Sequence, residues 1–305
     1  MSEAPWNLVT GEAQHILEKL RMLPGFGEYF SLAQGTGTRA DPVFFVRKLS
    51  ETKTSYKVFS KQTQKEYDIE KVFVKPSAKG KDIDSYEVKN DNQLLVFPYH
   101  GRDLVDRKEI QTRSPNLWSY LEECREPLEK RENGRWRGNN FYCYGRPQNH
   151  EMLALNKILV PVIVNKAKAA WDTTGLHVID SVYFVKREKR SDISNEYILA
   201  LLNSNLLTYF LMKTSSNLRG GYFSMKPGYV DRFPLKTTFS TKEEKEIYEQ
   251  ILQKVKRINA ISTVKSDNVR REITTLRETI DELVYRLYGL TEEERRIVDG
   301  LDALL

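Results

Sequence analysis

The stretch NEYILALLNSNLLTYFLMK, residues 195–213, is apolar on nearly every side when it is wound into a helix. Such a helix is covered by the rest of the protein, because exposed apolar surface is unfavourable in water. The polar triplet 203–205 does not suit a membrane span, and no run approaches 18 uninterrupted apolar residues. We therefore predict one buried helix here, inside a folded body.

On the N-terminal side of this helix, short apolar runs alternate with turn-forming residues. Runs of this length that are rich in Val, Ile, Phe and Tyr are typical of β-strands. They are PVFFVR (42–47), YKVF (56–59), KVFVK (71–75), QLLVFPY (93–99), KILVPVIV (157–164) and LHVIDSVYFVK (176–186). The intervening GTGT (35–38) and KPSAKGKD (75–82) predict loops. Ser114-Pro115 predicts the start of a helix that Pro127 kinks or ends.

On the C-terminal side the pattern becomes helical. Thr241 with Glu244, and Thr291 with Glu294, are capping-box pairs that open helices. Between them, apolar residues recur at alternating intervals of four and three over 269–287, as in a coiled-coil seam. The sequence therefore predicts an α+β protein, a mixed, sheet-rich body followed by a helical C-terminal tail. We expect a linker helix within 1–30, the body over 31–239 and the tail over 240–305.

The composition limits the class of protein without deciding it. The 305 residues carry 48 basic and 42 acidic side chains, a net charge of +6, which is compatible with a nucleic-acid partner. Two cysteines rule out a disulfide framework, and the four histidines lack metal-ligand spacing. The first residues, MSEAPWNLVTGE, lack the apolar core of a signal peptide. We expect a cytoplasmic protein without a membrane partner.

No motif in the sequence predicts catalysis. Gly35-Thr36-Gly37-Thr38 lacks the third glycine and the following helix of a cofactor-binding loop, so an ordinary turn is favoured. The Asn/Asp-Pro-Pro-aromatic motif of amino-methyltransferases is absent from the sequence. Asp68 with Glu87 and Lys89 fits a metal-dependent nuclease loosely, but no apolar strand surrounds Glu87. We predict neither catalytic residues nor metal ligands, and binding is better supported than catalysis.

One segment suited to DNA is RENGRWRGNNFYCYGRPQN (131–149), with four arginines against one acid and interleaved aromatic residues. Arginine forks match phosphates and guanine edges, and amide side chains match adenine edges. The predicted contacts are Arg135, Arg137, Arg146, Gln148 and Asn149. The alternative for Arg146 is a tight turn in which a structural carboxylate holds its side chain.

A second segment is KTSSNLRGGYFSMKPGY (213–229). Gly220-Gly221 permits positive φ and close approach to a phosphate, Arg219 and Lys226 add charge, and Tyr222 could stack on a base. The alternative is a hairpin whose aromatic residues belong to the core. The lysines of 75–81 form a third, weaker candidate, more typical of a solvated loop.

An ordered series of sequence words resembles the TaqI-like C-terminal specificity domain, the target-recognition module of adenine-specific DNA methyltransferases and type IIG restriction enzymes. The resemblance covers about residues 70–295. The matching words are KPSAKGKDIDSYEV (75–88), LLVFPY (94–99), PNLWSYLEECREPLEKR (115–131), YGRPQNHEML (144–153), KILVPVI (157–163), DSVYFV (180–185), ILALLNSNLLTYF (198–210), SSNLRGGYFSMKPGYVDRFPL (215–235) and ETIDELVYRLYGLTEEE (278–294).

The resemblance implies a sequence-specific DNA recognition module that gives target specificity to a separate catalytic domain. Segments 144–148 and 219–222 are its signature positions. S-adenosylmethionine, and Mg²⁺ where a nuclease is fused, belong to the missing catalytic part, and residues 1–30 to the linker that follows it. Double-stranded DNA and a methyltransferase domain or subunit are the expected partners. The alternatives are a nuclease domain, or a free-standing specificity or assembly subunit that pairs through the 269–287 seam.

Overall fold

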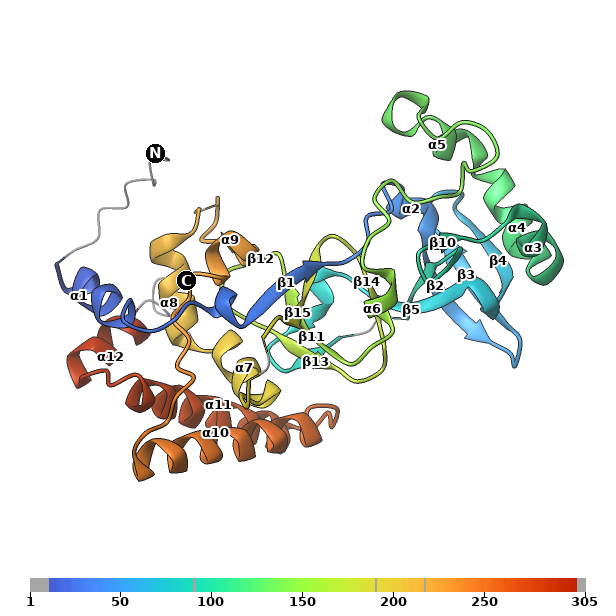
Figure 1. Ribbon diagram of the computed structural model, residues 1–305. Coiled ribbons are helices and arrows are strands. Elements are labelled where there is room, and N and C mark those ends of the chain that lie inside the picture. The colour runs from blue at the N-terminus through green and yellow to red at the C-terminus, as the bar shows by residue number, and fades with distance from the viewer. Residues whose placement is uncertain (1–10, 90–91, 190, 217, 301–305) are drawn as a thin grey trace.

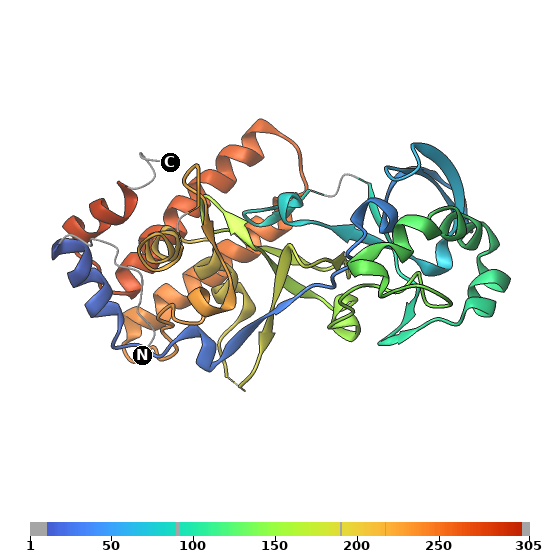
Figure 2. The same ribbon diagram turned by 90° about the horizontal axis from the view of Figure 1, so that it is seen from above.

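The computed structural model describes residues 11–89, 92–189, 191–216 and 218–300. It is an elongated α+β molecule in which a helical lobe and a sheet-rich lobe lie at opposite ends of a central sheet (Figure 1). Figure 2 shows the same separation from above. The predicted fold class is therefore confirmed.

The central sheet is antiparallel, in the order β1 (Phe30–Gln34), β15 (Val182–Arg187), β11 (Lys157–Pro161) and β13 (Ala170–Asp172). Side chains alternate between the two faces of a strand. Along β11, Ile158 and Val160 enter the core of the helical lobe, whereas Leu159 enters the core of the other lobe. The sheet is thus buried on both faces and joins the two cores.

The sheet-rich lobe contains a six-stranded sheet whose outer face is covered by α4 (Pro115–Glu123), with α3 (Arg107–Arg113) beside it and α5 (Arg125–Glu129) continuing from its end. From α4, the Tyr120 hydroxyl reaches Ser60 and the carbonyl of Val43. The strand order is β14 (His177–Val178), β5 (Val74–Ala78), β8 (Gln93–Val96), β2 (Phe45–Glu51), β3 (Ser55–Ser60) and β4 (Lys65–Glu70), of which only the β14–β5 pair is parallel.

The helical lobe packs around α7 (Asn195–Leu202) and α8 (Asn205–Thr214), with α1 (Gly11–Leu20), α9 (Pro227–Val230), α10 (Lys242–Ile261), α11 (Asp267–Leu287) and α12 (Glu292–Asp299). The predicted capping boxes open α10 and α12. The 269–287 seam packs against α10 of the same chain, so the surface that the assembly hypothesis requires is covered.

Smaller elements complete the chain. They are the helices α2 (Asp41–Phe44) and α6 (His150–Leu153), and the strand pairs β6 (Ile83–Asp84) with β7 (Glu87–Val88), β9 (Tyr99–His100) with β10 (Asp103–Leu104), and β12 (Ile163–Val164) with β16 (Phe223–Ser224).

The single helix predicted over 195–213 is wrong in one respect, because the chain turns between α7 and α8. The Asn203 amide exchanges hydrogen bonds with the backbone of Ala169, and the Ser204 hydroxyl accepts the N–H of Leu207 to cap α8. The polar triplet that argued against a membrane span is therefore the helix junction. Within the described ranges, no helix is long and apolar enough to cross a bilayer.

Other predicted boundaries also differ. The run at 42–47 begins as the short helix α2, because Pro42 suits a first helical turn, and its strand starts at Phe45. Residues 71–73 form a 3₁₀ turn, and 74–78 form the buried strand β5 where a loop was predicted. The helix break falls at Cys124 and not at Pro127, which occupies the first turn of α5. The proposed division at 30/31 and 239/240 stays a prediction, and residues 1–10 and 301–305 lie outside the described residues.

Candidate nucleic-acid interface

The Tyr144–His150 segment is clamped to the Gly35–Thr38 loop. Gly37 and Arg146 exchange backbone hydrogen bonds of 2.9 and 2.8 Å, and the N–H of Gly145 donates to Thr38. Burial lowers the pKa of His150, whose neutral ring lies 2.8 Å from the Thr36 hydroxyl. The loop and the turn therefore form one rigid unit.

The two amides predicted to contact bases support this unit. Gln148 Nε2 donates to the carbonyl of Gly35, and Asn149 Nδ2 donates to that of Gln34, each at 2.8 Å. Reading an adenine edge takes one amide donor and one acceptor. Each side chain thus already uses one donor to hold the scaffold, and its contact with DNA stays a prediction.

Arg146 is exposed at the tip of this unit. The alternative prediction was that a structural carboxylate binds Arg146. The carboxylate beside it is Asp180, which lies 4.0 Å from Nη1 of Arg39. Burial and the nearby Asp41 raise the pKa of Asp180, while Arg39 and Arg146 oppose that rise. Among the described residues no ion pair within 4.0 Å engages Arg146, so its guanidinium can still meet an anion.

Earlier in the same segment, Arg131 is structural. Its buried guanidinium donates to the carbonyls of Thr38, Leu128, Phe141 and Cys143. Phe141, Tyr142 and Tyr144 are buried in the core, so these interleaved aromatic residues serve packing and are not part of the exposed surface. Arg135 and Arg137 are exposed, and Arg135 Nη1 lies 3.6 Å from a Glu132 oxygen.

The second segment forms a tight turn before β16. Gly220 and Gly221 adopt φ of 77° and 74°, as predicted, and the N–H of Leu218 donates to the carbonyl of Tyr222. The core alternative is correct for Phe223, which is buried, but the Tyr222 side chain is 45% exposed. Arg219 and Lys226 are exposed and form no ion pair with the described residues.

These segments lie on one side of the molecule. In Figure 1, α5 and α9 both lie on the upper side, at opposite ends of the central sheet. The chain that leads into α6 passes between them. The two segments therefore belong to different lobes, the first to the sheet-rich lobe and the second to the helical lobe.

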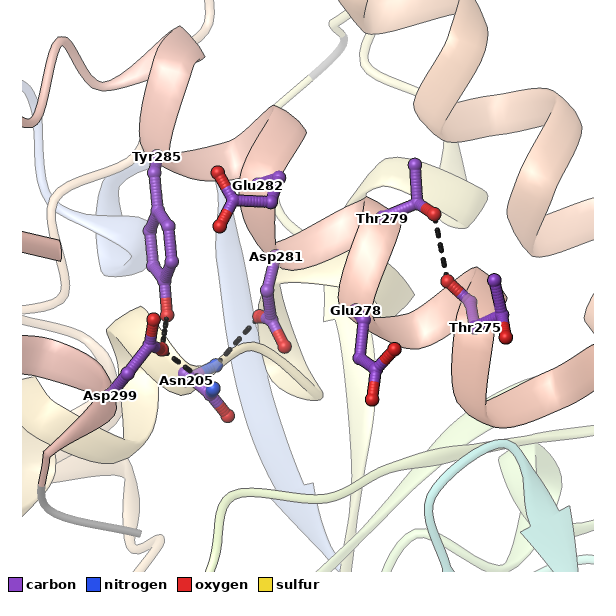
Figure 3. Close-up of a pocket in the computed structure, with 8 residues that line it drawn as sticks. All are labelled: Asn205, Thr275, Glu278, Thr279, Asp281, Glu282, Tyr285 and Asp299. Atoms are coloured by element: carbon purple, nitrogen blue, oxygen red, sulfur yellow. Dashed lines mark hydrogen bonds between the residues drawn. The ribbon is translucent and has the colours of Figure 1, made fainter. Parts of the chain in front are cut away.

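In contrast to these basic segments, an acidic pocket of about 410 Å³ lies between α8, α11 and α12 (Figure 3). Glu278, Asp281, Glu282 and Asp299 line it, so it repels phosphates. Asp281 accepts the N–H of Asn205 at the start of α8, and burial raises the pKa of Asp281 to about 7. This part of the helical lobe does not suit DNA.

The nuclease alternative is not favoured. Asp68 is exposed on β4, whereas Glu87 lies on β7 in a separate ribbon. Lys89 pairs with Asp84 at 2.6 Å. The part of the chain that the structure describes contains no group of three or more His, Cys, Asp or Glu side chains suited to a metal ion.

The Gly35–Thr38 loop does not fit S-adenosylmethionine. A Cβ at Gly35 would lie 2.4 Å from the carbonyl oxygen of Ile179, and the Arg146 turn covers Gly37. The loop is filled by the protein itself, so its glycines serve close packing.

The fold and this surface define an α+β domain whose exposed loops carry basic side chains. The chain belongs to the family of the TaqI-like C-terminal specificity domain, whose model matches residues 75–235. It is thus a specificity domain of the kind found in proteins related to type II methyltransferases.

Among characterised proteins, it is 24% identical over 239 residues to the type II methyltransferase M.PaeR7I of Pseudomonas aeruginosa, covering 76% of this chain and 37% of that protein. It is 29% identical over 147 residues to the type II methyltransferase M.BanIII of Aneurinibacillus aneurinilyticus, covering 47% and 25%. The chain therefore spans well under half the length of these relatives. The crystal structure of the type IIG restriction endonuclease BpuSI aligns with a TM-score of 0.46 at 10% identity, over 92% of this chain and 34% of that one.

Sequence reasoning missed two contributors to this surface. Arg39, with φ of 56°, lies against Gly145 and faces Asp180 beside Arg146. The Gly35–Thr38 loop was treated as an ordinary turn, although it holds the Arg146 turn in place. The glycines were the available signal, since Gly35 and Gly145 each leave no room for a side chain.

Proposed function

We propose that this chain is the DNA target-recognition module of a restriction-modification adenine-N6 methyltransferase, and gives target specificity to a separate catalytic domain or subunit. Family membership and the names of the relatives support the class. The observation that carries the proposal is that four of the predicted contacts, all within the matched segment, are exposed and form no ion pair with the described residues: Arg137, Arg146, Arg219 and Lys226.

In this proposal the basic side chains neutralise phosphates and fix the register of the duplex. Arg135, Arg137 and Lys226 act on the backbone, and Arg146 presents its fork to a guanine edge or a phosphate. The Gly220-Gly221 turn brings backbone N–H groups close to a phosphate, beside Arg219 and Tyr222. S-adenosylmethionine binds in the catalytic part, and Mg²⁺ is needed only where a nuclease is fused.

The salt dependence of DNA binding tests the proposal. With roughly five phosphate contacts, the logarithm of the affinity should fall against the logarithm of salt concentration with a slope of about −4 to −5. Fluorescence anisotropy of labelled duplexes, with this chain joined to its methyltransferase part, measures this slope. A flat response would reject the proposal.

A pair of variants localises the contacts. The Arg219→Gln/Lys226→Gln variant loses two exposed charges of the turn, so its slope should be shallower by about 2. Lys256→Gln removes an exposed charge from α10 in the helical lobe and should leave the slope unchanged. Equal slopes for the wild type and the double variant would place the DNA elsewhere on the chain.

A further inference from the structure

The face of the six-stranded sheet that α4 leaves uncovered is hollowed. Val46 and Val58 point into the core below α4, so Arg47 and Phe59 point to the opposite face by the alternation of strands. Arg47 lies directly opposite Phe59 on β3 and Gln93 on β8. These three side chains form one row across neighbouring strands.

Lysines converge on this row from two further segments. Lys61 follows β3, while Lys79 and Lys81 follow β5, and together with the row they line a cavity of about 420 Å³. The Lys79 ammonium lies 3.7 Å from the centre of the Phe45 ring and 3.5 Å from Asp41. One carboxylate thus faces four cations in this cavity.

The cations of this cavity differ in their pairing from several lysines of the same sheet. Elsewhere on the six-stranded sheet, Lys57 pairs with Glu66, Lys65 with Glu123, and both Lys48 and Lys71 with Glu51. Within the described ranges, Arg47, Lys61 and Lys81 have no carboxylate within 4.0 Å, and all three are exposed. Three cations without a carboxylate partner are therefore gathered where the sheet is hollow, an arrangement that suits an anionic ligand.

The cavity is linked to the Arg146 turn through Thr38. Thr38 accepts the N–H of Gly145 through its carbonyl, and its hydroxyl donates to Asp41, which lines the cavity. A ligand as long as a duplex can therefore reach both.

From these observations we infer a base-reading subsite of the DNA duplex, an inference that rests on the proposed function. Arg47 presents its fork to a guanine edge, with its guanidinium carbon 5.5 Å from the centre of the Phe59 ring that supports it. Gln93, one strand away at about 4.8 Å, faces the neighbouring base pair, whose rise is about 3.4 Å. Lys61, Lys79 and Lys81 bind the flanking phosphates.

The test uses this chain with its methyltransferase part. Short labelled duplexes selected by the wild type from a random pool, and the same duplexes with each base pair changed in turn, are titrated by anisotropy over a range of salt. The variants are Arg47→Lys, Lys61→Gln/Lys81→Gln, and the control Lys65→Gln on β4, which removes a charge paired on the α4 side. Circular dichroism checks that each variant is folded.

Arg47→Lys keeps the charge and loses the fork, so we expect the salt slope to persist while discrimination at one base pair falls by about 5- to 100-fold. The double lysine variant should weaken binding to every duplex and make the slope shallower by about 2, and Lys65→Gln should match the wild type. If the wild type binds and discriminates while both cavity variants match it, the subsite is wrong and the proposed function stands. If the wild type binds no duplex, both are wrong.

Discussion

At the scale of single residues, Arg131 shows that a basic residue in a basic segment can be purely structural. Its guanidinium satisfies carbonyls from three separate parts of the chain, the 38–39 turn, the end of α5 and residues 141–143, and no carboxylate pairs with it among the described residues. Buried carbonyls that lose their donors retain their full desolvation cost.

Arg131→Met should therefore lower the free energy of unfolding by about 3 kcal/mol or more. Urea denaturation followed by circular dichroism measures this change. Arg135→Met, at an exposed neighbour, should stay within about 0.5 kcal/mol of the wild type. Equal stability of the two variants would contradict the structural role of Arg131.

The glycine of the clamped loop gives a second prediction at this scale. Gly35→Ala places a Cβ 2.4 Å from the carbonyl oxygen of Ile179 and 2.5 Å from that of Val178, so backbone must move. We expect a loss of about 2 kcal/mol or more in the free energy of unfolding. Gly228→Ala is the matched control, because its Cβ meets nothing within 4 Å. A fully stable Gly35→Ala protein would show that the loop is not clamped.

At the scale of elements, the start of α8 is linked to pH through Asp281. Its pKa of about 7, against an ordinary 3.8, means that the folded protein holds a proton that the unfolded chain releases between these values. Stability should therefore fall as pH rises from about 4 to about 7. Asp281→Asn keeps an acceptor for the N–H of Asn205 and removes the charge.

We expect Asp281→Asn to be more stable than the wild type by about 1–3 kcal/mol near pH 8, and the difference to shrink towards pH 4. Urea midpoints across this range measure it. Glu278→Gln, an exposed change in the same pocket, should keep the wild-type pH slope. A slope that survives in Asp281→Asn would assign the titration to another group.

Elements with clear periodicity were predictable from sequence, and junctions were not. The seam of α11 and the capping boxes of α10 and α12 are local patterns, and they appear where predicted. The break between α7 and α8 depends on Asn203 meeting Ala169 from a distant segment. The strand β5 was not predicted because lysine and proline are not typical of strands, although its backbone pairs with β8.

The candidate surface shows the same division between local and distant information. Exposure of Arg146, and positive φ at Gly220-Gly221, followed from residue type and turn chemistry. The scaffold roles of Gln148 and Asn149 depend on the 34–35 backbone, more than a hundred residues away. The cavity that Arg47 lines brings together four separate segments, 41–47, 59–61, 79–81 and the strand with Gln93, which no short motif connects.

At the scale of the whole molecule, two cores share one central sheet, so the lobes hold the basic segments in fixed relation. A rigid arrangement of contacts suits sequence discrimination, because a poorly matched duplex cannot be accommodated by movement of the protein. The chain covers 37% and 25% of the methyltransferases that it resembles, so chemistry in the parent protein is proposed to lie outside it.

Selection from a random duplex pool tests the central claim, that this chain supplies sequence recognition, most directly. The methyltransferase part is incubated with the pool alone and together with this chain, and bound duplexes are sequenced. We predict that one sequence is enriched only when the chain is present. Equal enrichment of the same sequence without the chain would contradict the account.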